Sequence, residues 1–172
     1  MSDVRLATPI TADAYADYGH VVAASSAVPR VANHGTAAAW DDLAPLVNGR
    51  PASARPTVSV FRCAPLDGTA LDVRVLERHP RSTQLFVPMN ASRYLVVVAL
   101  GAVAPQTETL RAFVVEGATA ITYAPGIWHH PMVALDARID FVNVLFADGT
   151  ALDCEERSFE PALARVSVPS PR

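Results

Sequence analysis

Between residues 57 and 147, hydrophobic positions occur in short runs that are separated by Pro, Gly or Asp. The runs are rich in valine, leucine, isoleucine and aromatic residues, which is typical of β-strands. The pattern predicts eight strands, at 57–62, 71–78, 84–88, 93–100, 110–115, 119–123, 127–135 and 138–147. Short strands at nearly regular spacing predict an all-β sandwich or barrel.

The residues before the first predicted strand follow a different pattern. The segment 11–18 predicts one short helix, with Thr11 as its N-cap and Gly19 at its end. Residues 23–56 are rich in Ala, Ser, Pro, Asn and Gly, and they predict a long irregular arm with a tight turn at 33–36. The sequence therefore predicts a single domain over residues 1–165, followed by a mobile tail at 166–172.

The predicted strand at 71–78 ends in polar residues on one of its faces. Side chains alternate between the two faces of a strand, so positions 71, 73, 75, 77 and 79 share one face. That face begins with three apolar residues and ends in Glu77 and His79, whereas Arg78 lies on the opposite face. Because burying a charge is costly unless it is paired or coordinated, we expect Glu77 and His79 at the mouth of a pocket.

The predicted strand at 93–100 is apolar on both faces from Tyr94 to Leu100. We expect one face to meet the interior of the barrel. The other face needs a second layer, and a helix, the arm or another subunit are the alternatives.

Composition narrows the class of protein. With 51% hydrophobic and 18% charged residues, the chain is not intrinsically disordered, and a net charge of −3 makes nucleic acid an unexpected partner. All 14 basic residues are arginine, which excludes a Schiff-base lysine and a P-loop lysine. The two cysteines, Cys63 and Cys154, form no CxxC motif, and the N-terminus does not have the pattern of a signal peptide. We therefore expect a cytoplasmic protein that does not contact a membrane.

Imidazole, carboxylate and carboxamide groups occur at two places that a closed barrel would bring together. Glu77 and His79 precede Gln84 by a short turn, and His129 follows Gly126 much later in the chain. Imidazole and carboxylate suit zinc, iron, nickel or manganese, and carboxamide is a weaker oxygen ligand. These four side chains predict a site that either holds one divalent metal ion or works metal-free as acid, base and hydrogen-bond donors. Gly126 is expected to form the turn that aims His129 inward.

These residues resemble the metal-binding pattern of the cupins, a superfamily of jelly-roll β-barrels. In cupins an HxH motif, a nearby Glu and a later GxxH surround one metal; here Glu77 replaces the first His and Gln84 replaces the Glu. Longer segments resemble the ureidoglycolate lyase family, which is also named ureidoglycolate hydrolase. These segments are LERHP at 76–80, STQLFVP at 82–88, VVVA at 96–99, LRAF at 110–113 and GIWHHP at 126–131.

The resemblance implies a cupin-type jelly-roll barrel, a homodimer, and cleavage of ureidoglycolate to glyoxylate and urea in purine (allantoin) breakdown. This elimination needs a base and an acid, for which Glu77, His79 and His129 are the candidates. Arg78 and Arg93 are candidates for pairing with the substrate carboxylate. The full set of candidate substrate-binding residues is Gln84, Arg78, Arg93, Asn33, Tyr123 and Trp128.

The chain also departs from the family pattern. The segment TAAAW at 36–40 lacks the arginine that the family tends to carry after its Asn-x-Gly turn, and the segment 141–148 ends in Ala-Asp instead of Asp-Arg. If the missing arginines hold the substrate carboxylate in the family, the substrate here differs. The alternatives are a cupin lyase or hydrolase acting on another small hydroxy- or oxo-acid, and a non-catalytic cupin that binds a small carboxylate.

Overall fold

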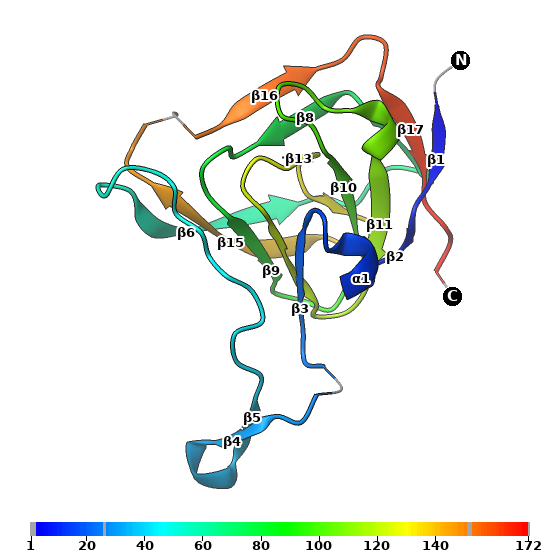
Figure 1. Ribbon diagram of the computed structural model, residues 1–172. Coiled ribbons are helices and arrows are strands. Elements are labelled where there is room, and N and C mark those ends of the chain that lie inside the picture. Colours follow the sequence, from blue (N-terminus) through cyan, green and yellow to red (C-terminus); the bar gives the residue numbers. More distant parts are fainter. Residues whose placement is uncertain (1–2, 26, 151–152, 172) are drawn as a thin grey trace.

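The chain folds almost entirely into β-strands (Figure 1). The structure is a computed structural model that describes residues 3–25, 27–150 and 153–171. Its strands are β1 (Val4–Leu6), β2 (Thr8–Pro9), β3 (Gly19–Val22), β4 (Arg30–Ala32), β5 (Ala37–Ala39), β6 (Arg55–Cys63), β7 (Ala70–Val73), β8 (Val75–Arg78), β9 (Gln84–Pro88), β10 (Tyr94–Ala99), β11 (Arg111–Val115), β12 (Ala120–Tyr123), β13 (Trp128–His129), β14 (Val133–Ala134), β15 (Ile139–Ala147), β16 (Glu155–Ser158) and β17 (Ala164–Ser167). Its helices are α1 (Ala12–Tyr15) and the 3₁₀ turns η1 (Asn33–Gly35) and η2 (Thr107–Thr109). The predicted all-β class is confirmed.

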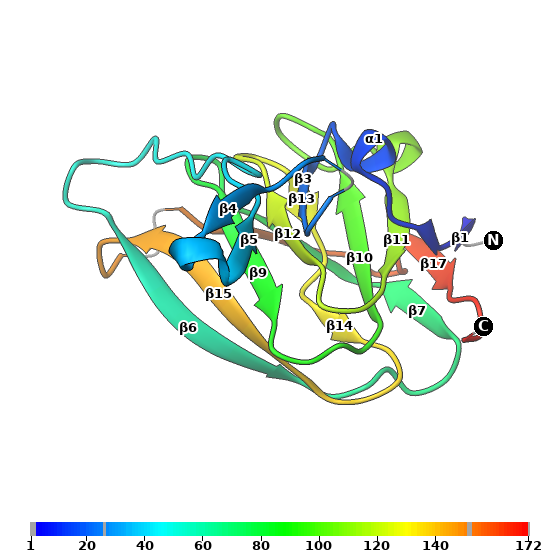
Figure 2. The ribbon, with the colours of Figure 1, turned by 90° about the horizontal axis from the view of Figure 1, so that it is seen from below.

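Three sheets form the body of the protein. A seven-stranded sheet has the order β16-β8-β13-β10-β11-β2, with β14 also paired to β10. A five-stranded sheet, β3-β12-β9-β15-β6, faces one side of it, and a three-stranded sheet, β1-β17-β7, covers the other side (Figure 2). The two larger sheets enclose a common core. In the described part of the chain, no strand pairing joins these two sheets, so the barrel is not closed.

Two apolar cores lie between these layers. The inner core joins the seven- and five-stranded sheets through side chains such as Val96 and Val98 of β10 with Phe86 and Phe141 of the facing sheet. The outer core packs the other face of β10 against β7 and β17, and its members include Leu95 and Val97 of β10. Strands of the same chain therefore form the second layer over β10, the strand that is apolar on both faces. The alternatives considered from the sequence for this layer, a helix, the arm or another subunit, are all wrong.

The predicted strand at 71–78 is interrupted at Arg74 and forms β7 and β8. Val73 and Leu76 are both fully buried in the outer core, although three residues apart they would lie on opposite faces of a regular strand. The predicted common face from 71 to 79 is therefore wrong. Its first residues pack in the outer core, whereas Glu77 and His79 lie on the opposite side of β8 from Leu76.

The chain ends form more structure than the sequence predicted. The predicted short helix and its N-cap are confirmed, since the Thr11 Oγ1 accepts a hydrogen bond from the Ala14 amide. Its predicted end is wrong, because the helix covers only Ala12–Tyr15 and ends before Gly19. The predicted start of the tail at residue 166 is wrong, because β17 pairs with β7 and β1 and Val166 is fully buried. The arm contains a short hairpin of β4 and β5 that stands away from the body (Figure 1). In the residues that the structure describes, no helix is long and apolar enough to cross a membrane.

Candidate active site

Glu77, His79 and His129 converge on one point beside the inner core. β13 runs antiparallel to β8, and this register places His129 directly opposite Glu77. Each of the three residues offers a ligand atom within 4.8 Å of the others. The Nε2 atom of His129 lies 3.4 Å from Oε1 of Glu77, and the centroids of the two imidazole rings are 5.7 Å apart. Strand pairing thus joins two segments that are about fifty residues apart in sequence.

Backbone carbonyl groups orient both imidazole rings. The Nδ1 atom of His79 lies 2.6 Å from the carbonyl oxygen of Asp153, and Nδ1 of His129 lies 2.9 Å from that of Ile127. A carbonyl oxygen only accepts hydrogen bonds, so Nδ1 of each ring carries the proton and Nε2 of the neutral ring carries a lone pair. This arrangement is typical of metal-ligating histidines, whose second ring nitrogen is fixed by a hydrogen bond.

A glycine turn brings the two histidine segments together. Gly126 has a φ of 81°, in the left-handed region that favours glycine. Its amide donates a hydrogen bond of 2.8 Å to the carbonyl oxygen of His79. The expected role of Gly126 in the turn before His129 is therefore confirmed.

Three buried polar atoms of the predicted site residues have no hydrogen-bond partner in the described part of the chain. Nε2 of His79, Nε2 of His129 and Oε1 of Gln84 are buried and have no hydrogen-bond partner among the described residues. With Nδ1 protonated, the lone pair of His129 Nε2 faces a carboxylate oxygen of Glu77, so two acceptors meet. A proton or a cation between them resolves this contact. Two imidazoles, a carboxylate and an amide oxygen fit a divalent metal such as zinc, iron, nickel or manganese.

The protonation of the site follows from its surroundings. The close contact with His129 is the main cause that holds the pKa of Glu77 below its usual range, and nearby imidazoles add to this effect. Burial is the main cause that lowers the pKa of His79, and the neighbouring His129 imidazole lowers it further. At neutral pH, the site therefore presents an ionised carboxylate and a neutral His79 imidazole.

The family model and the curated relatives place the chain in a family. A family model described as "Ureidoglycolate lyase" matches residues 3–166. The chain belongs to the ureidoglycolate lyase family. It is 40% identical over 163 residues to the protein named ureidoglycolate lyase from Burkholderia cepacia, covering 94% of this chain and 89% of that protein. It is 36% identical over 152 residues to the one from Pseudomonas fluorescens strain SBW25, covering 88% and 89%. Among solved structures, it is similar to RmlC from Streptococcus suis in complex with dTDP-D-xylose, with a TM-score of 0.38 at 12% identity, covering 57% of this chain and 46% of that chain.

In this member of the ureidoglycolate lyase family, aromatic residues occupy both sides of β13. The ring of Tyr123 stacks on that of His129, and its hydroxyl donates to Sδ of Met132 at 3.4 Å. Burial raises the pKa of Tyr123 well above its ordinary value, so its hydroxyl stays protonated. Trp128 instead packs in the outer core, and its Nε1 donates to the carbonyl oxygen of Gly101. Tyr123 therefore lies in the cluster and Trp128 lies outside it.

Three other predicted substrate-binding residues lie away from the cluster. Arg78 is on the outer side of β8, where it is paired with Glu155 and its guanidinium lies 4.5 Å from the centre of the Trp128 ring. Arg93 precedes β10, at the end opposite to the His129 pairing, and forms two hydrogen bonds with Asp136. Asn33 lies in the turn of the projecting hairpin. The structure therefore brings Tyr123 to the site and places Gln84 opposite Tyr123 on the neighbouring strand, whereas neither arginine reaches the site.

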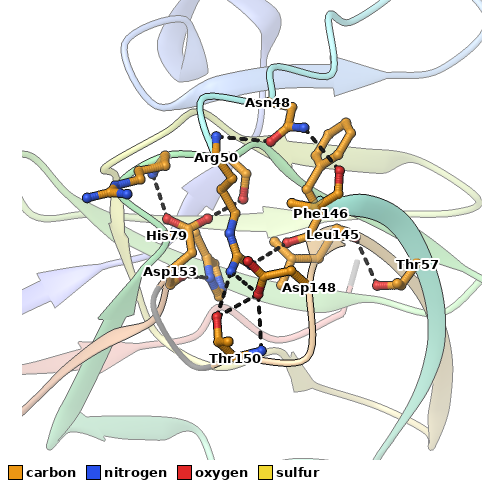
Figure 3. A network of polar contacts seen from close by, with 12 residues as sticks. Asn48, Arg50, Thr57, His79, Leu145, Phe146, Asp148, Thr150 and Asp153 are labelled. Atoms are coloured by element: carbon orange, nitrogen blue, oxygen red, sulfur yellow. Dashed lines mark hydrogen bonds and ion pairs between the residues drawn. The ribbon is translucent and has the colours of Figure 1, made fainter. Parts of the chain in front are cut away.

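Two residues near His79 were not singled out from the sequence. The buried carboxylate of Asp153 accepts hydrogen bonds from the Arg81 amide and the Ser82 hydroxyl, which fixes the segment whose carbonyl orients His79. Figure 3 shows the polar contacts of Asp153 and those of Arg50. The guanidinium of Arg50 is almost fully buried and donates to the Phe146 carbonyl at 2.8 Å, to Asp148 and to Thr150.

The sequence contains little that would have revealed these two residues. Asp153 follows the last long predicted strand, and Arg50 lies in the predicted irregular arm, where burial is not expected. Both make contacts with residues about seventy and one hundred positions away in sequence, and strand periodicity does not report such contacts.

Proposed function

We propose that this protein is a ureidoglycolate lyase that cleaves ureidoglycolate to glyoxylate and urea, a late step of purine breakdown. The family match over residues 3–166 supports this activity. The observation that carries the chemistry is the convergence of Glu77, His79 and His129 with unpartnered Nε2 atoms on both imidazoles. We further propose a single-domain, cytoplasmic homodimer, as expected from the sequence and its family resemblance.

The substrate is a carbinolamide, in which one carbon carries a hydroxyl, a carboxylate and a ureido nitrogen. The elimination breaks the O–H bond and the C–N bond, forms the C=O bond of glyoxylate, and places one proton on the departing nitrogen of urea. The reaction therefore needs one proton acceptor and one proton donor at the same carbon.

The two histidines have different environments, which suits them to these two roles. His79 is the acceptor, because its pKa is lowered and its Nε2 lone pair has no partner. His129 faces the ionised Glu77 at 3.4 Å, so this pair holds the proton that moves to the departing nitrogen. The amide of Gln84 and the ring of Tyr123 complete the wall of the site and position the substrate.

The same residues also fit a divalent cation. Glu77, His79 and His129 would hold it, and Gln84 would add an amide oxygen. When bound, such an ion supplies Lewis acidity to the hydroxyl and carboxylate oxygens of the substrate. The fixed Nδ1 protons of both histidines orient the rings equally well for this role.

A product assay tests the function. The purified protein is incubated with each enantiomer of ureidoglycolate, with and without a chelator and with added divalent metals, and glyoxylate, urea and ammonia are quantified. Equal amounts of glyoxylate and urea from one enantiomer support the lyase, whereas release of ammonia indicates a hydrolase. Loss of turnover in chelator that is restored by one metal shows that the cation takes part. An absence of turnover under every condition would overturn the proposed function.

A further inference from the structure

Two buried side-chain amides lie on neighbouring strands of the five-stranded sheet. Gln84, the first residue of β9, is 4% exposed, and Asn143, in the middle of β15, is 5% exposed. The oxygen of each amide, Oε1 of Gln84 and Oδ1 of Asn143, is buried and has no hydrogen-bond partner among the residues that the structure describes. Leaving a buried acceptor unpaired is costly, so each oxygen needs a donor that these residues do not supply.

The strand register places the two amides on the same face of the sheet. β9 and β15 run antiparallel side by side, with Asn143 directly opposite Phe86 (Figure 2). Phe86 is two residues beyond Gln84, so both side chains share one face, and Gln84 and Asn143 are diagonal neighbours with about 7–8 Å between them. Phe86 and Phe141, which lies two residues before Asn143, belong to the inner core. Both amides therefore point between the two larger sheets.

The pair of amides adjoins the Glu77–His79–His129 cluster through Tyr123. β9 lies between β12 and β15, and Gln84 is directly opposite Tyr123 on β12. The ring of Tyr123 stacks on that of His129, with 4.0 Å between the centroids. Asn143 lies one strand beyond Gln84 and one residue pair deeper in the core. The two amides thus extend the wall of the site away from the histidines.

Asn143 also lies next to the free edge of this sheet. β6 is the last strand of the sheet, and its exposed residue Ser59 lies directly opposite Asn143. Nδ2 of Asn143 donates to the Ser59 hydroxyl at 3.1 Å. This bond turns the amide nitrogen towards Ser59 and leaves the acceptor oxygen for another partner.

Two acceptor oxygens in an apolar wall favour a ligand that carries N–H donors. The two ends of ureidoglycolate differ in this respect, because the ionised carboxylate has only acceptors whereas the ureido group has an NH and an NH₂. A carboxylate placed here would bring acceptors together, and a ureido group would supply the donors. A site built to bind N–H groups rejects an analogue without them, because its own acceptors are then left unpaired.

We propose that Asn143, together with Gln84, binds the ureido end of the substrate and determines which carbinolamides the protein accepts. The two amide oxygens accept hydrogen bonds from the ureido nitrogens, while the carbon that bears the hydroxyl lies at Glu77, His79 and His129. The C–N bond that breaks then lies between the amides and the histidines. This assignment rests on the proposed function. Asn143 exchanges no proton, so its role is to select and orient the substrate.

The test is the direct binding of two ligands, measured by calorimetry without turnover. Oxalurate, the carbonyl analogue of ureidoglycolate, keeps the ureido group, whereas glyoxylate has a carboxylate and no N–H. In Asn143→Leu, the affinity for oxalurate is expected to fall by about tenfold through the lost hydrogen bond, and that for glyoxylate to change by less than about twofold. The matched control is Asn90→Leu, because Asn90 is exposed and bonds only the Arg138 carbonyl; both affinities should stay unchanged.

Steady-state kinetics give a second measurement on the same variants. The hydrogen bonds to the ureido group are present in both the bound substrate and the transition state. The KM of Asn143→Leu should therefore rise by about tenfold, while kcat stays within about twofold of the wild type. A role in packing alone would leave KM unchanged in a folded variant.

Thermal unfolding shows whether Asn143→Leu is folded, which is expected because leucine suits this apolar surrounding. If it does not fold, Ser59→Ala removes the hydroxyl that fixes the Asn143 amide, and it should weaken oxalurate binding by about threefold without affecting glyoxylate. A wild type that does not bind oxalurate, unchanged oxalurate affinity in the folded variant, or an equal loss for both ligands overturns the assignment. A wild type that shows the expected difference between the ligands and does not cleave ureidoglycolate retains this binding site and loses the proposed function.

Discussion

The imidazole of His129 lies flat against the phenol ring of Tyr123, with 4.0 Å between the ring centroids and 8° between the ring planes. Both side chains are buried, and the Nδ1 proton of His129 is fixed by the carbonyl of Ile127. Stacking therefore restrains the one remaining freedom of the imidazole, which is the tilt of its plane. The direction of the Nε2 lone pair towards Glu77 depends on this contact.

Tyr123 is expected to act through its ring and not through its hydroxyl. The Tyr123→Phe variant keeps the stacked ring and loses only a weak hydrogen bond to Met132, so its kcat should stay within about twofold of the wild type. The Tyr123→Leu variant removes the flat surface, and its kcat/KM should fall by about 10²-fold through misplacement of the imidazole. Steady-state kinetics on both variants, after unfolding curves confirm that they are folded, distinguish the two roles. An equal loss in the Phe variant would assign a direct role to the hydroxyl.

Glu77 is expected to be indispensable. Its replacement by glutamine removes the charge that faces His129, and kcat should fall by about 10²- to 10⁴-fold, the range of a lost acid–base group. The matched control is Glu156→Gln, because Glu156 lies directly opposite Glu77 on β16 and is exposed. Zinc titration calorimetry on the same two proteins shows whether Glu77 also holds a cation. Full activity of Glu77→Gln would remove Glu77 from the mechanism.

The sequence predicted the strands well because most of them obey a simple alternation. The strand predicted at 84–88 matches β9, and the one at 138–147 matches β15 within one residue. Prediction failed where the alternation is broken. The strand is interrupted at Arg74, and Val73 and Leu76 therefore both point into the outer core. The short strands of the two chain ends are held by pairing partners distant in sequence, and local composition does not report such partners.

The site was predictable in its ligand types and not in its supporting residues. Glu77, His79 and His129 stand out because imidazole and carboxylate recur next to turns. The arginines were chosen for their charge, yet the guanidinium groups of Arg78 and Arg93 are both engaged by carboxylates on the same chain. Asp153 orients His79 through its backbone carbonyl. Every residue type has this group, so the sequence does not indicate which residue makes the contact.

Ser82 and Asp153 are expected to act on His79 through position alone. Ser82→Ala removes the hydroxyl that fixes the buried Asp153 carboxylate, and this loosens the carbonyl that orients the imidazole. Loss of such an outer partner typically costs about 10- to 100-fold in metal affinity or activity. Zinc affinity and kcat of Ser82→Ala are compared with those of Ser158→Ala, which changes an exposed serine on β16. Values equal to those of the control would show that the Asp153 segment is held by other contacts.

Arg93 is expected to contribute to stability in a pH-dependent way and to leave turnover unchanged. The Arg93 guanidinium is the main cause that lowers the pKa of Asp136 below its ordinary value of 3.8. A carboxylate whose pKa is lower in the folded state stabilises the protein above the unfolded pKa, and the contribution is lost as the pH falls through the folded pKa. Because Asp136 is largely exposed, Arg93→Ala should cost about 0.5–1 kcal/mol of the free energy of unfolding at pH 7, and progressively less below about pH 4. Urea unfolding of both proteins at pH 7 and at pH 3 measures this difference. A loss of kcat in folded Arg93→Ala would instead return Arg93 to the substrate-binding residues.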